Sequence, residues 1–249
     1  MKRAYNRVML EPALPSPDLR SMNAATKEYL EAIYELTEEG QRVLQARIGE
    51  RLGLAPATVS QGMKRLAAEG MVLIEGRDIR LSDRGERVAQ TLVRRHRLAE
   101  RMLVDLLGIP WHLCHEQAED WEKVMTPEVE NAIIERIDGC DTCPHGNPIP
   151  GTATSIAWSD LEPVAALEPG RSATLVRLLE DVELNRDVLK YLEDAGLMPG
   201  AVLTVTQVAP DRTRTVRVQG RTIAVGADLA GHLWVLADST RTSSPSASA

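Results

Sequence analysis

The segment from about Arg84 to Leu107 places the strongest constraint on how this chain can fold. Its pattern predicts one long helix, and Ser82 just before it suits the capping position because its side chain can accept a hydrogen bond from the first turn. Within the helix, His96 and Glu100 are four residues apart, so they stand one above the other on one face. An imidazole and a carboxylate placed in this way can bind a metal ion without rearrangement.

The length and composition indicate a soluble protein of two or three modest domains. The chain has 249 residues, no Phe and four Trp, so its cores must be mainly aliphatic. No apolar run reaches the ~18 residues that a membrane helix needs, and Met1–Arg3 is followed by polar residues, so we expect a cytoplasmic protein with no membrane partner. The three cysteines Cys114, Cys140 and Cys143 are too few for a disulfide framework, which favours thiol or metal chemistry.

The charge is distributed unevenly along the chain. The net charge is −7, yet the segment 41–100 carries twelve Lys or Arg against seven Asp or Glu. A basic first third on an acidic remainder is typical of a protein that contacts DNA with one end and binds cations with the other.

The first part of the chain predicts an arm followed by a helix. Residues 1–21 contain three prolines and show no helical or strand period, so we expect a flexible arm. Apolar residues then recur at helical spacing from Thr26 to Glu38. Glu28 and Glu31 lie three apart, off that apolar stripe, and taken alone they favour solvated surface acids.

The next elements predict a winged helix-turn-helix over residues 22–94. A short helix from Leu44 ends near Gly53, and Pro56 suits the first turn of a second helix. Two apolar runs around Gly76-Arg77-Asp78 predict a hairpin wing whose arginines reach phosphates. The alternative is a purely structural helical domain with a hairpin. We assign DNA contacts to Ala55, Ala57, Thr58, Ser60, Gln61, Lys64, Arg77 and Arg80, since small and hydrogen-bonding side chains suit a helix entering the major groove.

Residues 95–152 predict a helical metal-binding and dimerisation domain. A helix that ends near Val124 carries His115, Glu119 and Glu122 on a face that is normally apolar, although a lone histidine such as His115 can also be structural. The helix that follows is apolar and, with the end of the long helix, could close a two-fold dimer. In the turn after it, Cys143 and His145 suit a site completed by residues elsewhere in the fold, whereas we interpret Cys140 as a bystander.

The last part of the chain predicts a linker at residues 153–171, a β module at 172–238 and a disordered Ser/Thr-rich tail at 239–249. Five short apolar runs separated by Gly and Pro turns, with one helix from Arg186 to Asp194, indicate an SH3-like β-barrel. The predicted fold class is therefore mainly α with a C-terminal β module: a winged helix-turn-helix, a helical dimerisation domain and an SH3-like barrel.

From about Ala25 to Leu236 the chain resembles the diphtheria-toxin-repressor family of metal-dependent transcriptional regulators. Four stretches carry the resemblance in this order: Tyr29-Leu30-Glu31-Ala32-Ile33-Tyr34, Thr58-Val59-Ser60-Gln61, His96-Arg97-Leu98-Ala99-Glu100-Arg101 and Gly146-Asn147-Pro148-Ile149-Pro150-Gly151. The barrel resembles the family's third domain, which is related to ferrous-transport accessory proteins.

The resemblance implies two metal sites. The primary site would comprise Glu28, Glu31, His96, Glu119 and Glu122, and the secondary site Glu100, His115, Cys143 and His145 with Asp181 or Glu183 from the barrel. Iron-type members place Met and Cys where this chain has Glu28 and Glu119, so the carboxylates resemble manganese-type members. The chain departs from the family at Lys123, where a histidine ligand is usual and a protonated lysine cannot ligate.

The resemblance implies a metal-dependent DNA-binding regulator, specifically a homodimer that uses Mn²⁺ to repress metal-uptake genes by binding double-stranded operator DNA. An iron-dependent (Fe²⁺) repressor of the same family is the alternative. From other classes, an intracellular metal-storage protein remains open, as does a metallohydrolase, since His115-Glu116-Gln117-Ala118-Glu119 is similar to a helical metalloprotease motif without its second histidine. We expect no catalytic site.

Overall fold

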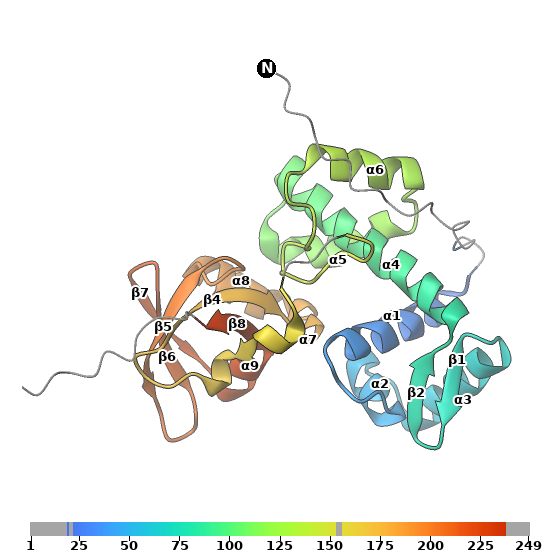
Figure 1. The fold of residues 1–249 in the computed structure, drawn as a ribbon, viewed down its shortest axis with the longest axis horizontal. Helices are drawn as coiled ribbons and strands as arrows, with labels where there is room; N and C mark the ends of the chain where they lie inside the picture. The colour runs from blue at the N-terminus through green and yellow to red at the C-terminus, as the bar shows by residue number, and fades with distance from the viewer. Residues whose placement is uncertain (1–18, 20–21, 153–155, 238–249) are drawn as a thin grey trace, which may run out of the picture.

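The computed structural model describes residues 19, 22–152 and 156–237 (Figure 1). The arm expected at residues 1–21, apart from the buried Leu19, and the tail expected at 239–249 lie outside the described residues. A winged-helix unit, a helical unit and a β module follow one another along the chain, and the colours in Figure 1 run through them in that order.

The winged-helix unit has the predicted order of three helices and a hairpin. Asn23 caps the first helix by accepting a hydrogen bond from the Ala25 amide, and Gly53 ends the second helix in the left-handed conformation that glycine adopts without strain. The two strands of the wing pair antiparallel, with Val72 opposite Leu81. The elements are α1 (Ala24–Glu38), α2 (Gln45–Leu52), α3 (Pro56–Ala68), β1 (Val72–Glu75) and β2 (Asp78–Leu81).

The long helix α4 (Asp83–Arg101) joins the winged-helix unit to the helical unit. Ser82 caps it as predicted, and the helix continues through a π-helical turn at Met102–Leu106. Residues of its first half, such as Leu92, pack in the core of the winged-helix unit, whereas Leu98 and Leu103 pack in the core of the helical unit. One helix therefore belongs to both cores.

The helical unit adds a 3₁₀ turn at Trp111–Leu113, α5 (Cys114–Glu122) and α6 (Pro127–Arg136). Its apolar side chains divide into two groups. Leu103, Ile133 and Ile137 are buried inward. A second group of apolar side chains is exposed on the ends of these helices and the loops after them: Leu106, Leu107, Trp121, Val124 and Val129.

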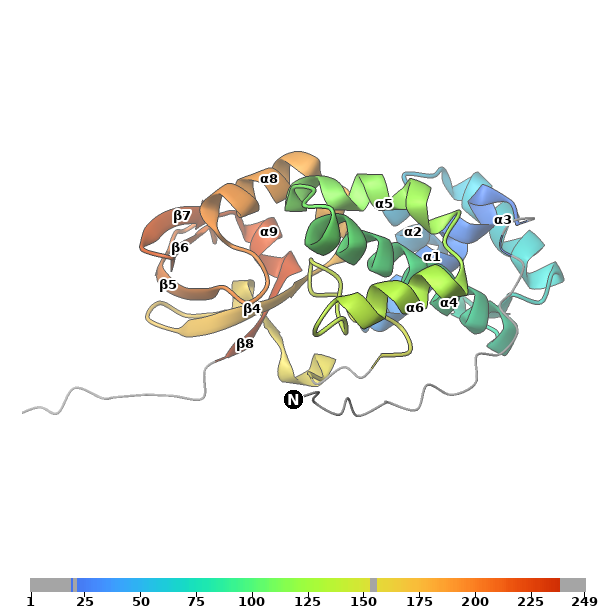
Figure 2. The same ribbon diagram turned by 90° about the horizontal axis from the view of Figure 1, so that it is seen from above.

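The β module contains one antiparallel sheet in the strand order β3-β8-β4-β5-β6-β7, so β3 and β7 lie at its edges. Figure 2 shows the curved sheet with α8 packed beside it. The strands are β3 (Glu162–Pro163), β4 (Ser172–Leu178), β5 (Val202–Val208), β6 (Arg214–Val218), β7 (Arg221–Val225) and β8 (Leu233–Ala237), and the helices are α7 (Glu180–Glu183), α8 (Arg186–Ala195) and α9 (Ala227–His232).

Part of the segment that we expected to be a linker belongs to this module. Glu162 and Pro163 pair with β8, and the side chains of Val164 and Leu167 are buried in the module's core. The composition of residues 153–171 resembles a linker, but these apolar side chains give its second half enough buried surface to pack.

Buried ion pairs hold the module against the other two units. The two terminal guanidinium nitrogens of Arg97 on α4 each donate to Glu38 on α1 at 2.9 Å, and one of them also donates to Glu180 on α7 at 2.6 Å. Arg177 on β4 donates to the same Glu38 at 3.0 Å. Arg97 is 1% exposed, so these charges are shielded from water and depend on one another. The contacts bring α7 beside α4, which positions the carboxylates of α7.

Candidate metal centre and nucleic-acid interface

A pocket of about 360 Å³ is lined by residues of α1, α4, α5 and α7. All five residues predicted for the primary metal site line it: Glu28 and Glu31 from α1, His96 from α4, and Glu119 and Glu122 from α5. Three helices from two units of the fold thus bring four carboxylates and one imidazole to a single cavity.

Among the five predicted ligands in this pocket, His96 and Glu122 are in direct contact. The Nδ1 atom of His96 lies 2.7 Å from Oε2 of Glu122. Burial and the nearby charge of Glu122 raise the pKa of Glu31 to about 8. A carboxyl group that is costly to ionise beside another carboxylate favours a cation that neutralises both.

Lys123 lines the same pocket, but its ammonium pairs with Asp120 on α5 at 3.1 Å. The hydrogen bond to Asp120 raises the pKa of Lys123 above its ordinary value. The lysine therefore stays charged, which agrees with its exclusion as a metal ligand.

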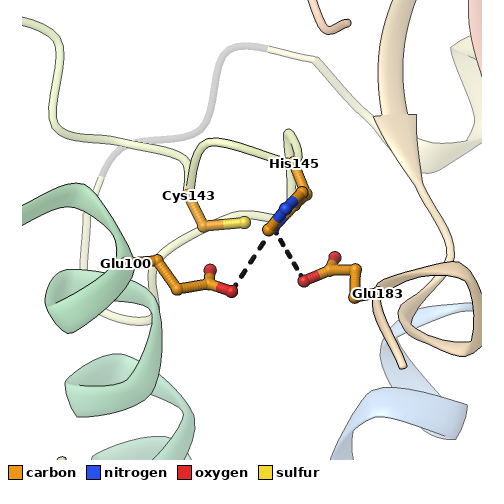
Figure 3. A group of neighbouring side chains, drawn as sticks. All are labelled: Glu100, Cys143, His145 and Glu183. Carbon is orange, nitrogen blue, oxygen red and sulfur yellow. Dashed lines mark ion pairs between the residues drawn. The ribbon is translucent and has the colours of Figure 1, made fainter. Parts of the chain in front are cut away.

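A second cluster lies deeper, where α4, α7 and the turn after α6 meet. Figure 3 shows Glu100, Cys143, His145 and Glu183 pointing toward one another. Their ligand atoms all lie within 4.8 Å of one another, and all four residues are buried. The Nδ1 atom of His145 is 2.9 Å from Glu183 Oε2 and 3.3 Å from Glu100 Oε1.

The structure distinguishes between the two barrel carboxylates that the sequence left open. Glu183 is part of the cluster, whereas the Asp181 carboxylate pairs with Arg51 on α2 at 2.5 Å and is absent from the groups formed by the described residues. Glu180, which was not predicted from the sequence, also belongs here, since its carboxylate groups with His115 and Glu183. The sequence feature that could have identified Glu180 is its spacing of three residues from Glu183, the same as between Glu28 and Glu31.

His96 and His115 connect the pocket to this second cluster. The Nε2 atom of His96 lies 3.1 Å from Nδ1 of His115 and 3.4 Å from Oε1 of Glu100. His115 Nδ1 in turn lies 3.1 Å from Glu100 and 3.3 Å from Glu183. The two predicted sites are therefore neighbours, with the His96 ring between them.

The second cluster has charges that suit a divalent cation. Burial alone would lower the pKa of His145, but the charges of Glu183 and Glu100 hold it well above its ordinary value. Burial likewise opposes ionisation of Glu100, yet His145 and hydrogen bonds from the histidines hold its pKa well below the usual range. Without a cation, protons on the imidazoles balance the carboxylates.

The donor atoms of the second cluster also fit a metal. Within the described part of the chain, the buried Oε2 of Glu100 has no hydrogen-bond partner. Two carboxylates, an imidazole and a thiol form a donor set that divalent transition metals accept. Binding would displace protons from these groups, as is general for metal sites built from ionisable ligands.

The residues predicted to contact DNA lie on one helix and the wing. Ala55, Ala57, Thr58, Gln61 and Lys64 are exposed, and Ser60 is partly buried. On the wing, Arg77 is exposed and Arg80 forms an ion pair with Glu75 of the paired strand. The face of α3 is thus free of packing contacts from its own unit at most of the predicted positions.

Tyr29 connects α1, which carries two of the predicted ligands in the metal pocket, to α3, whose exposed face is predicted to contact DNA. Tyr29 lies between Glu28 and Glu31 on α1, and its ring packs against Gly62 on α3. A Cβ atom on Gly62 would lie 2.5 Å from the Tyr29 ring, so only glycine allows this approach.

Comparisons with known proteins agree with this architecture. Residues 21–78 match the iron dependent repressor N-terminal DNA binding domain, residues 82–151 its metal binding and dimerisation domain, and residues 162–237 the FeoA domain. Among the described residues, no helix combines the length and apolarity needed to cross a bilayer.

Several proteins are similar over most of their length. The chain is 37% identical over 205 residues to the iron-dependent repressor IdeR of Mycobacterium tuberculosis, covering 78% of this chain and 89% of IdeR. It is 33% identical over 220 residues to the diphtheria toxin repressor of Corynebacterium diphtheriae, covering 85% and 96%.

Two solved structures share the fold. The IdeR of T. acidophilum superposes with a TM-score of 0.69 at 32% identity over 88% of this chain and all (100%) of that one. A manganese-dependent transcriptional repressor in complex with manganese gives 0.74 at 28% identity over 85% and 99%. The chain belongs to the iron-dependent repressor family, the metal-dependent DNA-binding repressors that include IdeR and the diphtheria toxin repressor.

Proposed function

We propose that this chain is a manganese-responsive repressor that binds operator DNA as a homodimer when its metal centre is filled. The observation that carries the proposal is the common pocket of Glu28, Glu31, His96, Glu119 and Glu122. A bound divalent cation supplies positive charge that holds the carboxylates of α1 and α5 together. Oxygen donors with one imidazole suit Mn²⁺, and a manganese-dependent repressor is among the similar structures.

Contacts within the chain transmit the effect of metal binding from the metal pocket to the helix that contacts DNA. Glu28 and Glu31 move only with α1, and Tyr29 packs α1 directly on α3. Fixing α1 against α4 and α5 therefore fixes the orientation of the recognition helix. By linkage, operator DNA must also tighten metal binding by the same factor.

The dimer would form through the exposed apolar side chains of the helical unit. Leu106, Leu107, Trp121, Val124 and Val129 would be covered by the same surface of a second copy. Two recognition helices related by two-fold symmetry match half-sites about one DNA turn, roughly 34 Å, apart. The expected targets are metal-uptake genes, repressed in the cytoplasm when the metal is abundant.

Fe²⁺ is the alternative metal, because the similar IdeR proteins are named as iron-dependent. The secondary site includes the Cys143 sulfur, a softer donor that favours Fe²⁺ over Mn²⁺. Titration of the metal-free protein with Mn²⁺ and, without oxygen, Fe²⁺, with operator binding as the readout, distinguishes the two metals.

The storage and hydrolase alternatives are tested by the double variant Ser60→Ala with Gln61→Ala, since both residues lie on α3 and away from the metal pocket. A repressor should keep its Mn²⁺ affinity and lose operator binding. Wild-type protein that binds Mn²⁺ but has no DNA affinity would support storage, and metal-dependent peptide hydrolysis would support the hydrolase.

A further inference from the structure

We propose that Cys114 is a positioning residue of the secondary metal site: its sulfur accepts a hydrogen bond from Nε2–H of His145 and so presents Nδ1 of that ring to the metal. The inference rests on the proposed function, in which Glu100, Cys143, His145 and Glu183 hold a divalent cation.

The two nitrogens of the His145 ring face different partners. Nδ1 faces the carboxylates of Glu183 and Glu100, at 2.9 and 3.3 Å. Nε2 lies 3.8 Å from the Cys114 sulfur, a hydrogen-bond distance for that atom. Because the lone pairs of an imidazole diverge, a group that faces Nε2 cannot share the ion bound at Nδ1. Cys114 therefore contacts the ligand from the side away from the metal.

The neighbours of the His145 ring restrain its plane, and Cys114 is the hydrogen-bond partner of its Nε2 atom. The Trp111 ring lies against His145 with the ring centres 4.7 Å apart, and its indole nitrogen donates to the Pro144 carbonyl at 2.9 Å. These are a ring contact and a hydrogen bond to the backbone, so neither selects a nitrogen of His145. Cys114 and His145 are both fully buried, at 0% exposed, so water does not replace the thiol.

The position of Cys114 in the fold makes the contact rigid. It is the first residue of α5, and the next residue is His115, whose ring faces the same carboxylates. A histidine that binds a metal through one nitrogen carries its proton on the other, and the partner of that proton sets the tautomer and the orientation of the ring. The Nε2–H···S contact would perform this role here.

The test compares three variants of the full-length protein. Cys114→Val removes the acceptor, Cys114→Ser keeps one, and Cys140→Val is the matched control, because Cys140 is a buried cysteine of the same helical core. Loss of a contact of this kind weakens metal binding about 10- to 100-fold. We expect that loss at the secondary site in Cys114→Val, near-complete recovery in Cys114→Ser, and no change at the primary site or in Cys140→Val. Mn²⁺ binding is measured by competition with a metal indicator.

A spectroscopic measurement on the unmodified protein tests the tautomer directly. In Cd²⁺-loaded protein labelled with ¹⁵N-histidine, the His145 resonances should show cadmium coupling to Nδ1 and a proton on Nε2. Replacing Cys114 by Ser should shift the Nε2–H resonance and leave the His232 signals unchanged. The reading is overturned if cadmium couples to Nε2, or if Cys114→Val and Cys140→Val bind Mn²⁺ equally well.

The cadmium experiment distinguishes failure of the secondary site from failure of the role proposed for Cys114. If Cd²⁺ couples to neither nitrogen of His145, the secondary site itself is wrong and the role of Cys114 falls with it. If Cd²⁺ couples to His145 Nδ1 and the Cys114 variants behave like the control, the site stands and only the positioning role is contradicted.

Discussion

The hydroxyl of Tyr29 on α1 donates a hydrogen bond to the backbone carbonyl of Thr58 on α3, over 3.3 Å. The helix that offers Glu28 and Glu31 to the metal pocket is thus bonded to the helix that offers its exposed face to DNA. Through this contact, a metal ion that fixes the position of α1 also affects the position of the recognition helix α3.

The packing of Tyr29 on Gly62 should be sensitive to a single methyl group. Gly62→Ala places a Cβ 2.5 Å from the Tyr29 ring, and overpacking of this kind costs about 1–3 kcal/mol of unfolding free energy. The double variant Gly62→Ala with Tyr29→Leu should recover part of that loss, because the smaller side chain makes room. Urea unfolding of the four proteins in the cycle measures the coupling, and additive losses would contradict the direct contact.

The metal-free protein should become less stable as the pH rises from about 6.5 to 9. Burial and the charge of Glu122 raise the pKa of Glu31 from 4.5 to about 8. Burial opposes the shift at His115, but hydrogen bonds to Glu100 and Glu183 raise its pKa from 6.5 to about 9. Both groups bind protons more tightly in the folded state. Their contribution to the free energy of unfolding is therefore complete below the pKa of the unfolded state, and it is lost as the pH rises through the pKa of the folded state.

Thermal unfolding in chelator and in excess Mn²⁺ measures this effect. Mn²⁺ should reduce the decline, because the cation replaces the protons in balancing the carboxylates. A metal-free protein that gains stability between pH 6.5 and 9 would show that these shifts have the opposite sign.

The ion pairs of Arg97 should be costly to break from one side. Arg97→Met removes this partner from the buried carboxylate of Glu180 and from the partly buried carboxylate of Glu38. Loss of one member of a buried ion pair typically costs about 3–5 kcal/mol. As a control, Arg171→Met removes an exposed pair with Glu162, for which about 0–1 kcal/mol is expected. Equal losses in urea unfolding would mean that the Arg97 pairs do not connect the three units.

The apolar surface of the helical unit should control the oligomeric state. Leu107 is 56% exposed, and Leu107→Glu places a charge in the proposed dimer contact. Val202 on the β module is 57% exposed, so Val202→Glu adds the same charge at a matched position outside that contact. Light scattering after size-exclusion chromatography should find a monomer for Leu107→Glu and a dimer for Val202→Glu. A Leu107→Glu dimer would place the interface elsewhere.

The primary pocket was predictable from the sequence because its members are set by helical spacing. Glu28 with Glu31, and Glu119 with Glu122, each lie three apart on one helix face, so a correct helix prediction orients each pair at once. The resemblance to a known family then supplied which faces meet, and the structure places them in one pocket.

The contribution of the β module could not be predicted to the residue. Asp181 and Glu183 are two apart in the four-residue helix α7, which is too short to show a period in the sequence. The choice between them depends on Arg51, which is 130 positions earlier in the chain and pairs with Asp181. The burial of Val164 and Leu167 in the module was missed for the same reason, since it depends on partners far along the chain.

The most direct test is the affinity of the protein for operator DNA with and without Mn²⁺, by fluorescence anisotropy at fixed salt, since phosphate contacts make affinity salt-dependent. We predict that Mn²⁺ tightens binding of the metal-stripped protein by tenfold or more, about 1.4 kcal/mol of coupling. Glu122→Gln, which alters the partner of His96, should lose this response, whereas Glu116→Gln on the exposed side of α5 should keep it. Equal DNA affinity with and without Mn²⁺ and Fe²⁺ would contradict a metal-gated repressor.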